Sequence, residues 1–318
     1  MLPHFTPCPA HAPRRPSHLS HIATGLLLLG LLSACSARPF VLTARPEPDL
    51  TPWQEDIGHG KSGHAFRYMH LDAQTPGDTA FLFLHGGIFD HRLWYYMHPL
   101  AQHGALYALE FPNVHAFHDG GIESMGRIVD DFAALIPETH IYVVGVSAGA
   151  WAAVEWAATQ RDKTLDGVVL ASSVMFGANA KESRKRARMS RFAVGLTPPQ
   201  LQHIVERRAR RTTYTEAEGP LQQIDIFYTR PYPYYYQLFH QTHAQGDRRQ
   251  NTDGIRCPLL VLHGDRDKVM PIDVARLTPA MFPNATRTDF QVVPGGNHDM
   301  IFGNGGDISR RIADFFFE

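Results

Sequence analysis

The chain has 318 residues, with 30 Lys and Arg against 31 Asp and Glu, so its formal net charge is −1 at pH 7. This balance argues against a general nucleic-acid-binding role, because a phosphate backbone is bound through a surplus of basic side chains. Hydrophobic residues make up 44% of the composition, as in an ordinary globular protein. Length, composition and charge therefore predict a folded globular chain and leave its chemistry open.

The first 34 residues have the organisation of a secretory signal. Arg14 and Arg15 precede an apolar run over residues 22–32, which is shorter than the about 20 residues that a membrane-spanning helix needs. Residues 32–35, Leu-Ser-Ala-Cys, resemble a bacterial lipobox. The resemblance implies that residues 1–34 are a lipoprotein signal peptide and that Cys35 is lipidated. An ordinary signal peptide with a small-residue cleavage site is the alternative.

A tether is expected to follow the modified cysteine, because residues 35–52 are rich in proline and therefore extended. Several acyl chains on Cys35 would hold the protein on a membrane, since each buried methylene contributes about 0.8 kcal/mol. The residue after Cys35 is Ser36, so the acidic residue that retains lipoproteins in the inner membrane of some enteric bacteria is absent at this position. We therefore expect the protein to be lipid-anchored in the bacterial cell envelope, facing the periplasm, with the outer membrane favoured over the inner one.

From residue 53 onwards, β-rich runs alternate with helix-forming stretches. Strands are expected at residues 64–71, 79–84, 105–111, 140–144, 165–170, 258–262 and 288–293. Helices are expected at residues 92–102, 121–136, 148–160, 272–281 and 307–316. This alternation predicts an α/β fold, with a mostly parallel central sheet and helices on both faces.

Residues 58–63, Gly-His-Gly-Lys-Ser-Gly, formally match a dinucleotide-binding fingerprint. No hydrophobic strand of useful length precedes them, so a glycine-rich turn is the better interpretation. The sequence also lacks a His-Glu-x-x-His motif and paired Cys-x-x-Cys motifs, which are typical of zinc sites. We therefore expect neither a cofactor nor a metal.

Residues 145–149 read Gly-Val-Ser-Ala-Gly and lie between a β-rich run and an alanine-rich stretch. A serine on a sharp strand-to-helix turn has its hydroxyl pushed out of the sheet, and flanking glycines remove Cβ atoms that would block so tight a bend. Ser147 is therefore a candidate nucleophile. Such a hydroxyl needs a base to take its proton and an acid to orient that base.

Both partners occur further along the chain, each in the loop that follows an expected strand: Asp267 first and His298 second. The order Ser, acid, His resembles that of the α/β-hydrolase fold serine hydrolases, of esterase and lipase type. The resemblance covers roughly residues 64–318 and implies a catalytic triad of Ser147, Asp267 and His298.

Asp265 is a rival for the acid of this triad. We prefer Asp267, because the family's pattern places the acid just ahead of a Val-x-Pro segment, which residues 269–271 match here.

The same resemblance implies an oxyanion hole. The expected strand at residues 79–84 leads into His-Gly-Gly-Ile at residues 85–88, which resembles the family's oxyanion loop. The backbone N–H groups of Gly87 and Ala148 would then face the oxyanion. Ile88 stands where the esterase pattern has a third glycine, so two donors are expected instead of three.

Residues 176–251 interrupt the alternation, because they are basic and aromatic and contain no expected strand of the sheet. Many α/β-hydrolases insert a helical cap at this place. Four basic residues recur there at helical spacing: Lys181, Arg184, Lys185 and Arg188. They form either a surface for anionic head groups or a solvated helix face. The expected organisation is a hydrolase core over residues 53–175 and 252–318, with a helical cap insertion over residues 176–251.

The reaction that this resemblance implies is hydrolysis of a carboxylic ester. Ser147 attacks the acyl carbonyl, His298 takes its proton and Asp267 holds the imidazole tautomer, before water frees the acyl-enzyme. The expected substrate is a small-molecule or lipid ester, and the oligomeric state stays open. Thioester hydrolysis, acyl transfer and perhydrolysis use the same residues, and a non-catalytic lipid-anchored binding protein is a further alternative.

Overall fold

The computed structural model describes residues 49–87, 89–112, 122–160, 162–175 and 251–318. The expected signal peptide, Cys35 and most of the tether lie outside the described residues, as do Ile88 and the expected cap except for Asn251. In the described part of the chain, no helix combines the length and the apolar character that crossing a membrane requires.

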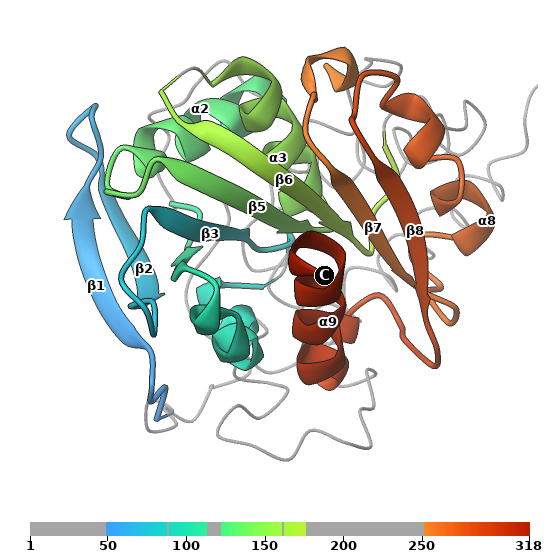
Figure 1. The fold of residues 1–318 in the computed structure, drawn as a ribbon, viewed down its shortest axis with the longest axis horizontal. Coiled ribbons are helices and arrows are strands. Elements are labelled where there is room, and N and C mark those ends of the chain that lie inside the picture. The colour runs from blue at the N-terminus through green and yellow to red at the C-terminus, as the bar shows by residue number, and fades with distance from the viewer. Residues whose placement is uncertain (1–48, 88, 113–121, 161, 176–250) are drawn as a thin grey trace, which may run out of the picture. The chain divides into compact units, whose positions relative to one another are not determined.

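An eight-stranded sheet runs through the described structure (Figure 1), in the order β1-β2-β4-β3-β5-β6-β7-β8. The strands are β1 Gln54–His59, β2 Ala65–Leu71, β3 Thr79–Leu84, β4 Ala105–Leu109, β5 His140–Val146, β6 Thr164–Ala171, β7 Leu259–Gly264 and β8 Thr288–Val293. Strands β1, β2 and β4 pair antiparallel, and all pairs from β4 to β8 are parallel. The predicted mostly parallel sheet is confirmed.

Strand β1 was not predicted from the sequence. Its residues, Gln-Glu-Asp-Ile-Gly-His, are almost all exposed, so they show no alternation of apolar and polar positions. The strand forms because it pairs along its whole length with β2, from Gln54 opposite His70 to His59 opposite Ala65. The glycine-rich turn predicted at residues 58–63 is confirmed only in its second part, because Gly58 and His59 are the last residues of β1. The rest links the two strands: Gly63 has a φ of 83°, and Ser62 N–H donates to Asp131 Oδ1 at 2.6 Å.

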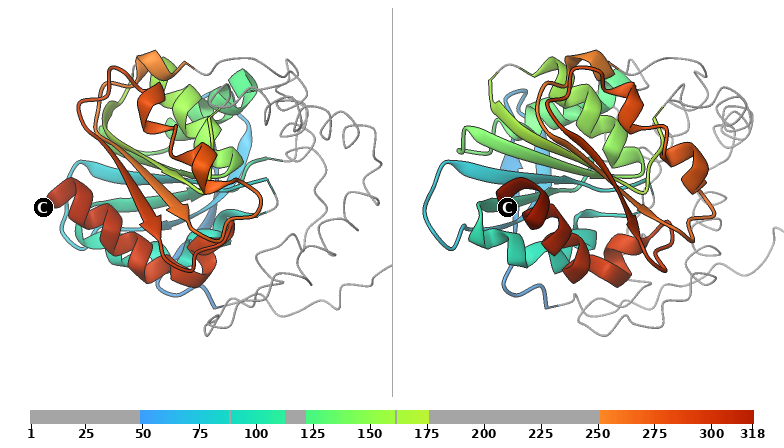
Figure 2. Two further views of the ribbon diagram at one scale, coloured as in Figure 1. Left: turned by 90° about the vertical axis from the view of Figure 1, so that its right-hand side faces the viewer. Right: turned by 45° about the vertical axis from the view of Figure 1, so that its right-hand side comes forward.

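Helices cover both faces of the sheet (Figures 1 and 2), as predicted. On one face lie α2 (Ile122–Ala133) and α3 (Ala148–Thr159). On the other lie the 3₁₀ helix η1 (His91–Gln102) and α9 (Met300–Phe317). In the left view of Figure 2, the dark red α9 lies below the strands and the green α3 above them.

Two helix predictions need correction. The helix expected over residues 272–281 is reduced to α8 (Ile272–Ala275) and the short 3₁₀ turn η3 (Pro279–Met281), since a proline cannot donate the hydrogen bond that would continue the helix. The helix expected over residues 307–316 is preceded by a further helical turn from Met300, and the two are joined in α9 across a kink at Asn304, whose φ of −125° and ψ of 20° are not helical. The glycines at residues 303, 305 and 306 have a low helix propensity, so this first part was not predicted. A further 3₁₀ turn, η2 (Thr252–Gly254), precedes β7.

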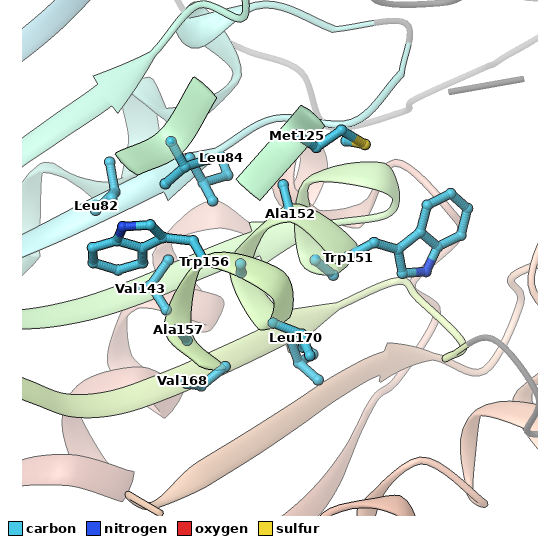
Figure 3. Close-up of a cluster of buried hydrophobic side chains, with 14 of the residues drawn as sticks. Leu82, Leu84, Met125, Val143, Trp151, Ala152, Trp156, Ala157, Val168 and Leu170 are labelled. Atoms are coloured by element: carbon cyan, nitrogen blue, oxygen red, sulfur yellow. The ribbon is translucent and has the colours of Figure 1, made fainter. Parts of the chain in front are cut away.

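The core consists of two layers, because side chains of a strand alternate between the faces. On β3, Leu82 and Leu84 pack with α2 and α3, whereas Phe81 and Phe83 pack with η1 and α9. Figure 3 shows Ala152 of α3 within the first layer.

Helix α3 is buried along its whole length from Ala148 to Ala158, which explains why it is apolar all round. Trp151 and Trp156 project to different sides of the helix (Figure 3), and both are almost fully buried. Burying a large apolar side chain contributes roughly 1.5–3 kcal/mol. Ser147, which directly precedes α3, is therefore attached to a helix that is buried along its length.

Candidate active site

Ser147 forms the turn between β5 and α3. Its φ of 53° and ψ of −115° lie in a region that residues with a side chain rarely adopt. The flanking glycines make the turn possible: a Cβ on Gly145 would lie 2.4 Å from the carbonyl oxygen of Gly149, and a Cβ on Gly149 would lie 2.0 Å from that of Leu84. Both contacts are with backbone, so neither glycine can be replaced without moving the turn.

Three side chains that are far apart in the sequence meet at this turn. His298 Nε2 lies 3.1 Å from Ser147 Oγ, and His298 Nδ1 lies 2.8 Å from Asp267 Oδ2. The exposed fractions are 5% for Ser147, 8% for Asp267 and 6% for His298. Since an ionised carboxylate can only accept, Nδ1–H donates to Asp267, and the lone pair of Nε2 faces the serine hydroxyl. The structure thus joins the three residues that the sequence singles out.

The carboxylate of Asp267 is held on both of its oxygens. While Oδ2 meets His298, Oδ1 accepts hydrogen bonds from the backbone N–H groups of Val269 and Met270, each at 2.7 Å. Burial alone would raise the pKa of Asp267, but the charge and hydrogen bond of His298 and the Met270 N–H lower the pKa below its ordinary value. The rival Asp265 is exposed and accepts instead from the backbone of Gly295 at 2.8 Å.

The end of β6 and the segment after it hold the turn at Ser147 in place through hydrogen bonds. Ser147 N–H donates to the carbonyl of Ala171 at 2.9 Å, and Ser173 Oγ donates to the carbonyl of Ser147 at 3.1 Å. Trp151 Nε1 donates to the carbonyl of Val174 at 2.9 Å. This support was not predicted from the sequence, where its only signal is a pair of serines directly after an apolar strand.

The loop after β3 passes directly against the nucleophile, since a Cβ on Gly86 would lie 3.2 Å from Ser147 Cβ. His85 is fully buried, and its Nε2 accepts from the backbone N–H of Phe111 at 3.0 Å, so Nδ1 carries the proton and donates to the carbonyl of Gly86 at 2.8 Å. Burial lowers the pKa of His85 to about 4. Gly87 follows in this loop, and Ala148 is the first residue of α3.

A buried charge cluster fixes the far end of the same loop. Asp90 accepts from the backbone N–H of Arg92 at 2.9 Å and pairs with its guanidinium at 2.7 Å. The fully buried His91 lies between two carboxylates, with Nε2 2.6 Å from Glu55 Oε1 and Nδ1 2.9 Å from Glu110 Oε2. These contacts join β1, the end of β4 and η1, and none of them was predicted from the sequence.

His91 makes the stability of the protein depend on pH. Burial alone would lower the pKa of His91, but its hydrogen bonds to Glu110 and Glu55 outweigh burial and raise the pKa above the usual 6.5. A raised folded-state pKa gives a contribution that is complete below about pH 6.5 and is lost as the pH rises through the folded-state value. We expect the free energy of unfolding of the wild type, relative to His91→Gln, to decline in urea titrations as the pH rises above about 6.5. A constant difference would contradict a protonated His91.

Within the described ranges, no three His, Cys, Asp or Glu side chains are grouped so that they could hold a metal ion. The groups assembled there are a serine hydroxyl, an imidazole, a carboxylate and a glycine-containing loop. Together they suit nucleophilic attack assisted by a general base.

Comparisons with solved structures show the same fold. An esterase from Thermogutta terrifontis is 20% identical and has a TM-score of 0.60, over 82% of this chain and 97% of that chain. The esterase RhEst1 from Rhodococcus sp. is 16% identical, with a TM-score of 0.58 over 82% and 98%. The enol-lactonase from Burkholderia xenovorans is 16% identical, with a TM-score of 0.64 over 83% and 100%. A search of curated proteins gave no match.

The sequence profile of a family described as "Alpha/beta hydrolase family" matches residues 81–310. This match covers most of the chain, including most of β3, the turn at Ser147 and the loops with Asp267 and His298. The chain therefore belongs to the alpha/beta hydrolase family.

Proposed function

We propose that the protein is a serine hydrolase that cleaves carboxylic esters through an acyl-enzyme intermediate. The observation that carries the proposal is the series of hydrogen bonds from Ser147 through His298 to Asp267. A hydroxyl, a neutral imidazole and a buried carboxylate in this order form a nucleophile, its base and the group that orients the base. Membership of the family and the similarity of fold to two esterases and a lactonase support hydrolysis of an ester.

The reaction begins when Ser147 Oγ forms a bond to the acyl carbon and its proton passes to His298 Nε2. Asp267 stabilises the resulting imidazolium. The carbonyl oxygen becomes negatively charged, and the N–H groups of Gly87 and Ala148 bind it; each such donor contributes roughly 3 kcal/mol to the transition state. His298 then gives its proton to the leaving alcohol, whose bond to the acyl carbon breaks.

Water completes the cycle. The water oxygen attacks the acyl carbon of the acyl-enzyme while His298 takes a proton from the water. His298 then returns that proton to Ser147 Oγ as the bond to the acyl carbon breaks and the carboxylic acid leaves. The two backbone donors on Asp267 Oδ1 keep Oδ2 directed at His298 in both halves of the reaction.

Thioesterase, acyltransferase and perhydrolase reactions use the same three residues as ester hydrolysis. One set of activity assays can therefore decide which substrate and which acyl acceptor the protein prefers. A series of p-nitrophenyl esters of increasing acyl length separates small-molecule esters from lipid esters. Thioester analogues, alcohol acceptors and hydrogen peroxide supply the remaining comparisons.

The role of Ser147 can be tested by covalent labelling. A fluorophosphonate probe should modify the wild type at Ser147, and Ser147→Ala should lose both the label and at least about a thousandfold in kcat, because no nucleophile remains. The control is Ser309→Ala, which removes a buried serine of α9 far along the chain from the turn and should keep both. A folded wild type that is never labelled would instead favour a non-catalytic binding protein.

The two neighbouring aspartates give a matched test of the acid. Asp267→Asn should lower kcat about 10³- to 10⁴-fold, because an amide favours the wrong imidazole tautomer, whereas Asp265→Asn should stay within about threefold of the wild type. Equal losses in both variants would contradict the assignment.

We also propose that the protein is anchored in the bacterial cell envelope through lipidated Cys35, on the support of the sequence of residues 14–35. Expressed in a bacterium fed an alkynyl fatty acid, the wild type should carry the label and sediment with membranes. Cys35→Ser should lose the label, because the acceptor sulfur is gone, and the control Cys257→Ser should keep it. A label that survives in Cys35→Ser would contradict the proposal.

A further inference from the structure

A second histidine lies behind the carboxylate of the site. His263 belongs to the last residues of β7 and is fully buried. Its Nε2 lies 2.8 Å from the carbonyl oxygen of Met270 and 3.5 Å from Asp267 Oδ2. Two imidazoles, those of His263 and His298, therefore face the same carboxylate oxygen. Only His298 lies between the carboxylate and Ser147.

The partners of His263 decide its protonation. A carbonyl oxygen only accepts, so Nε2 carries the proton, and the buried Nδ1 has no hydrogen-bond partner among the described residues. The ring stacks on Phe290, with 6.4 Å between centroids, and the guanidinium of Arg276 lies 5.1 Å from the same Phe290 ring. Burial lowers the pKa of His263. The ring is therefore neutral and does not compete with His298 for the charge of the carboxylate.

Met270 connects this neutral ring to the acid. Its carbonyl accepts from His263, and its N–H donates to Asp267 Oδ1 at 2.7 Å. The backbone at Met270 is thus held on both sides, and its orientation sets the direction of a donor to the carboxylate. Without the donor of His263, a buried carbonyl would lose its partner, which favours rotation of this backbone segment.

The loops of the acid and the base are also packed against each other. A Cβ on Gly264 would lie 2.2 Å from the carbonyl oxygen of Gly296, two residues before His298. A shift of the turn at residues 264–270 would therefore change the position of Asp267 relative to the ring that it orients.

We propose that His263 is a positioning residue, whose Nε2–H fixes the Met270 carbonyl and thereby holds the carboxylate of Asp267 in line with His298. The inference rests on the proposed function, because it gives His263 a task within that site. His263 itself touches neither substrate nor the hydroxyl of Ser147.

The side-chain amides of Asn and Gln provide a matched pair of variants. In His263→Gln the amide N–H can reach about as far as Nε2 and should still bind the Met270 carbonyl, whereas in His263→Asn it is one methylene too short. The control is Leu260→Ala, which removes buried volume from the same strand on the opposite face of the sheet, where Leu260 packs in the layer of η1 and α9. Thermal unfolding of every variant separates loss of fold from loss of geometry.

His263→Asn should lower kcat about 10- to 100-fold, as expected for a misplaced catalytic group, and should change KM by no more than about twofold. The acid limb of its kcat/KM profile should move to lower pH, because a displaced carboxylate stabilises the imidazolium less. His263→Gln should recover most of kcat and the position of the acid limb. Leu260→Ala should lower the unfolding temperature and leave both kcat and the acid limb unchanged.

A readout that needs no substrate keeps this inference separate from the proposed function. The His298 Nδ1 proton, bound to Asp267, should give a downfield NMR signal in the wild type and in His263→Gln, and should lose or shift it in His263→Asn. This pattern supports the inference even if no ester is hydrolysed. A folded His263→Asn with the signal, kcat and acid limb of the wild type would overturn it. If His263→Asn does not fold, a folded His263→Gln that lacks the signal or has lost kcat would overturn it equally.

Discussion

A serine held in an unfavourable backbone conformation is possible only where the surrounding structure leaves no alternative, and Ser147 is such a residue. Its conformation costs of order 1–3 kcal/mol. The cost is offset by β5 in the middle of the sheet, by the buried helix α3 and by the hydrogen bonds to Ala171 and Ser173. The loop after β3 contacts this turn directly, His298 contacts Ser147, and Asp267 contacts His298.

Parallel pairing brings those groups to it. Because β3, β5, β6, β7 and β8 run in the same direction, the loops at their carboxyl ends meet at one edge of the sheet. The loops after β7 and β8 supply Asp267 and His298, and the loop after β3 supplies the backbone beside Ser147. The sheet converts large separations along the chain into hydrogen-bond distances.

Three buried histidines around the site differ in charge because their partners differ. His85 and His263 each lie at the carboxyl end of a strand, precede a glycine and donate to a loop carbonyl, and burial lowers the pKa of both. His91 meets two carboxylates instead, and these raise its pKa against the effect of burial. The neutral rings of His85 and His263 thus fix loops without adding charge beside Asp267. The charged ring of His91 instead joins β1, the end of β4 and η1.

The sequence by itself determined the elements with a strong local signal. Strand-like runs marked every strand from β2 to β8, the composition of residues 148–160 marked α3, and the glycines around Ser147 marked the turn. The order of Ser147, Asp267 and His298 after separate strands indicated the site, because turn chemistry and hydrophobic runs are properties of neighbouring residues. Strand β1 was not predicted, because this exposed edge strand lacks a hydrophobic pattern.

Only the tertiary structure decided which distant residues meet. The contacts of His91 with Glu55 and Glu110, and of Ser173 with Ser147, join different strands and loops. The bond from His263 to Met270 is short-range in sequence, but it depends on how the acid loop folds back over β7. Such contacts follow from sheet register, loop path and packing, which no local pattern of residues specifies.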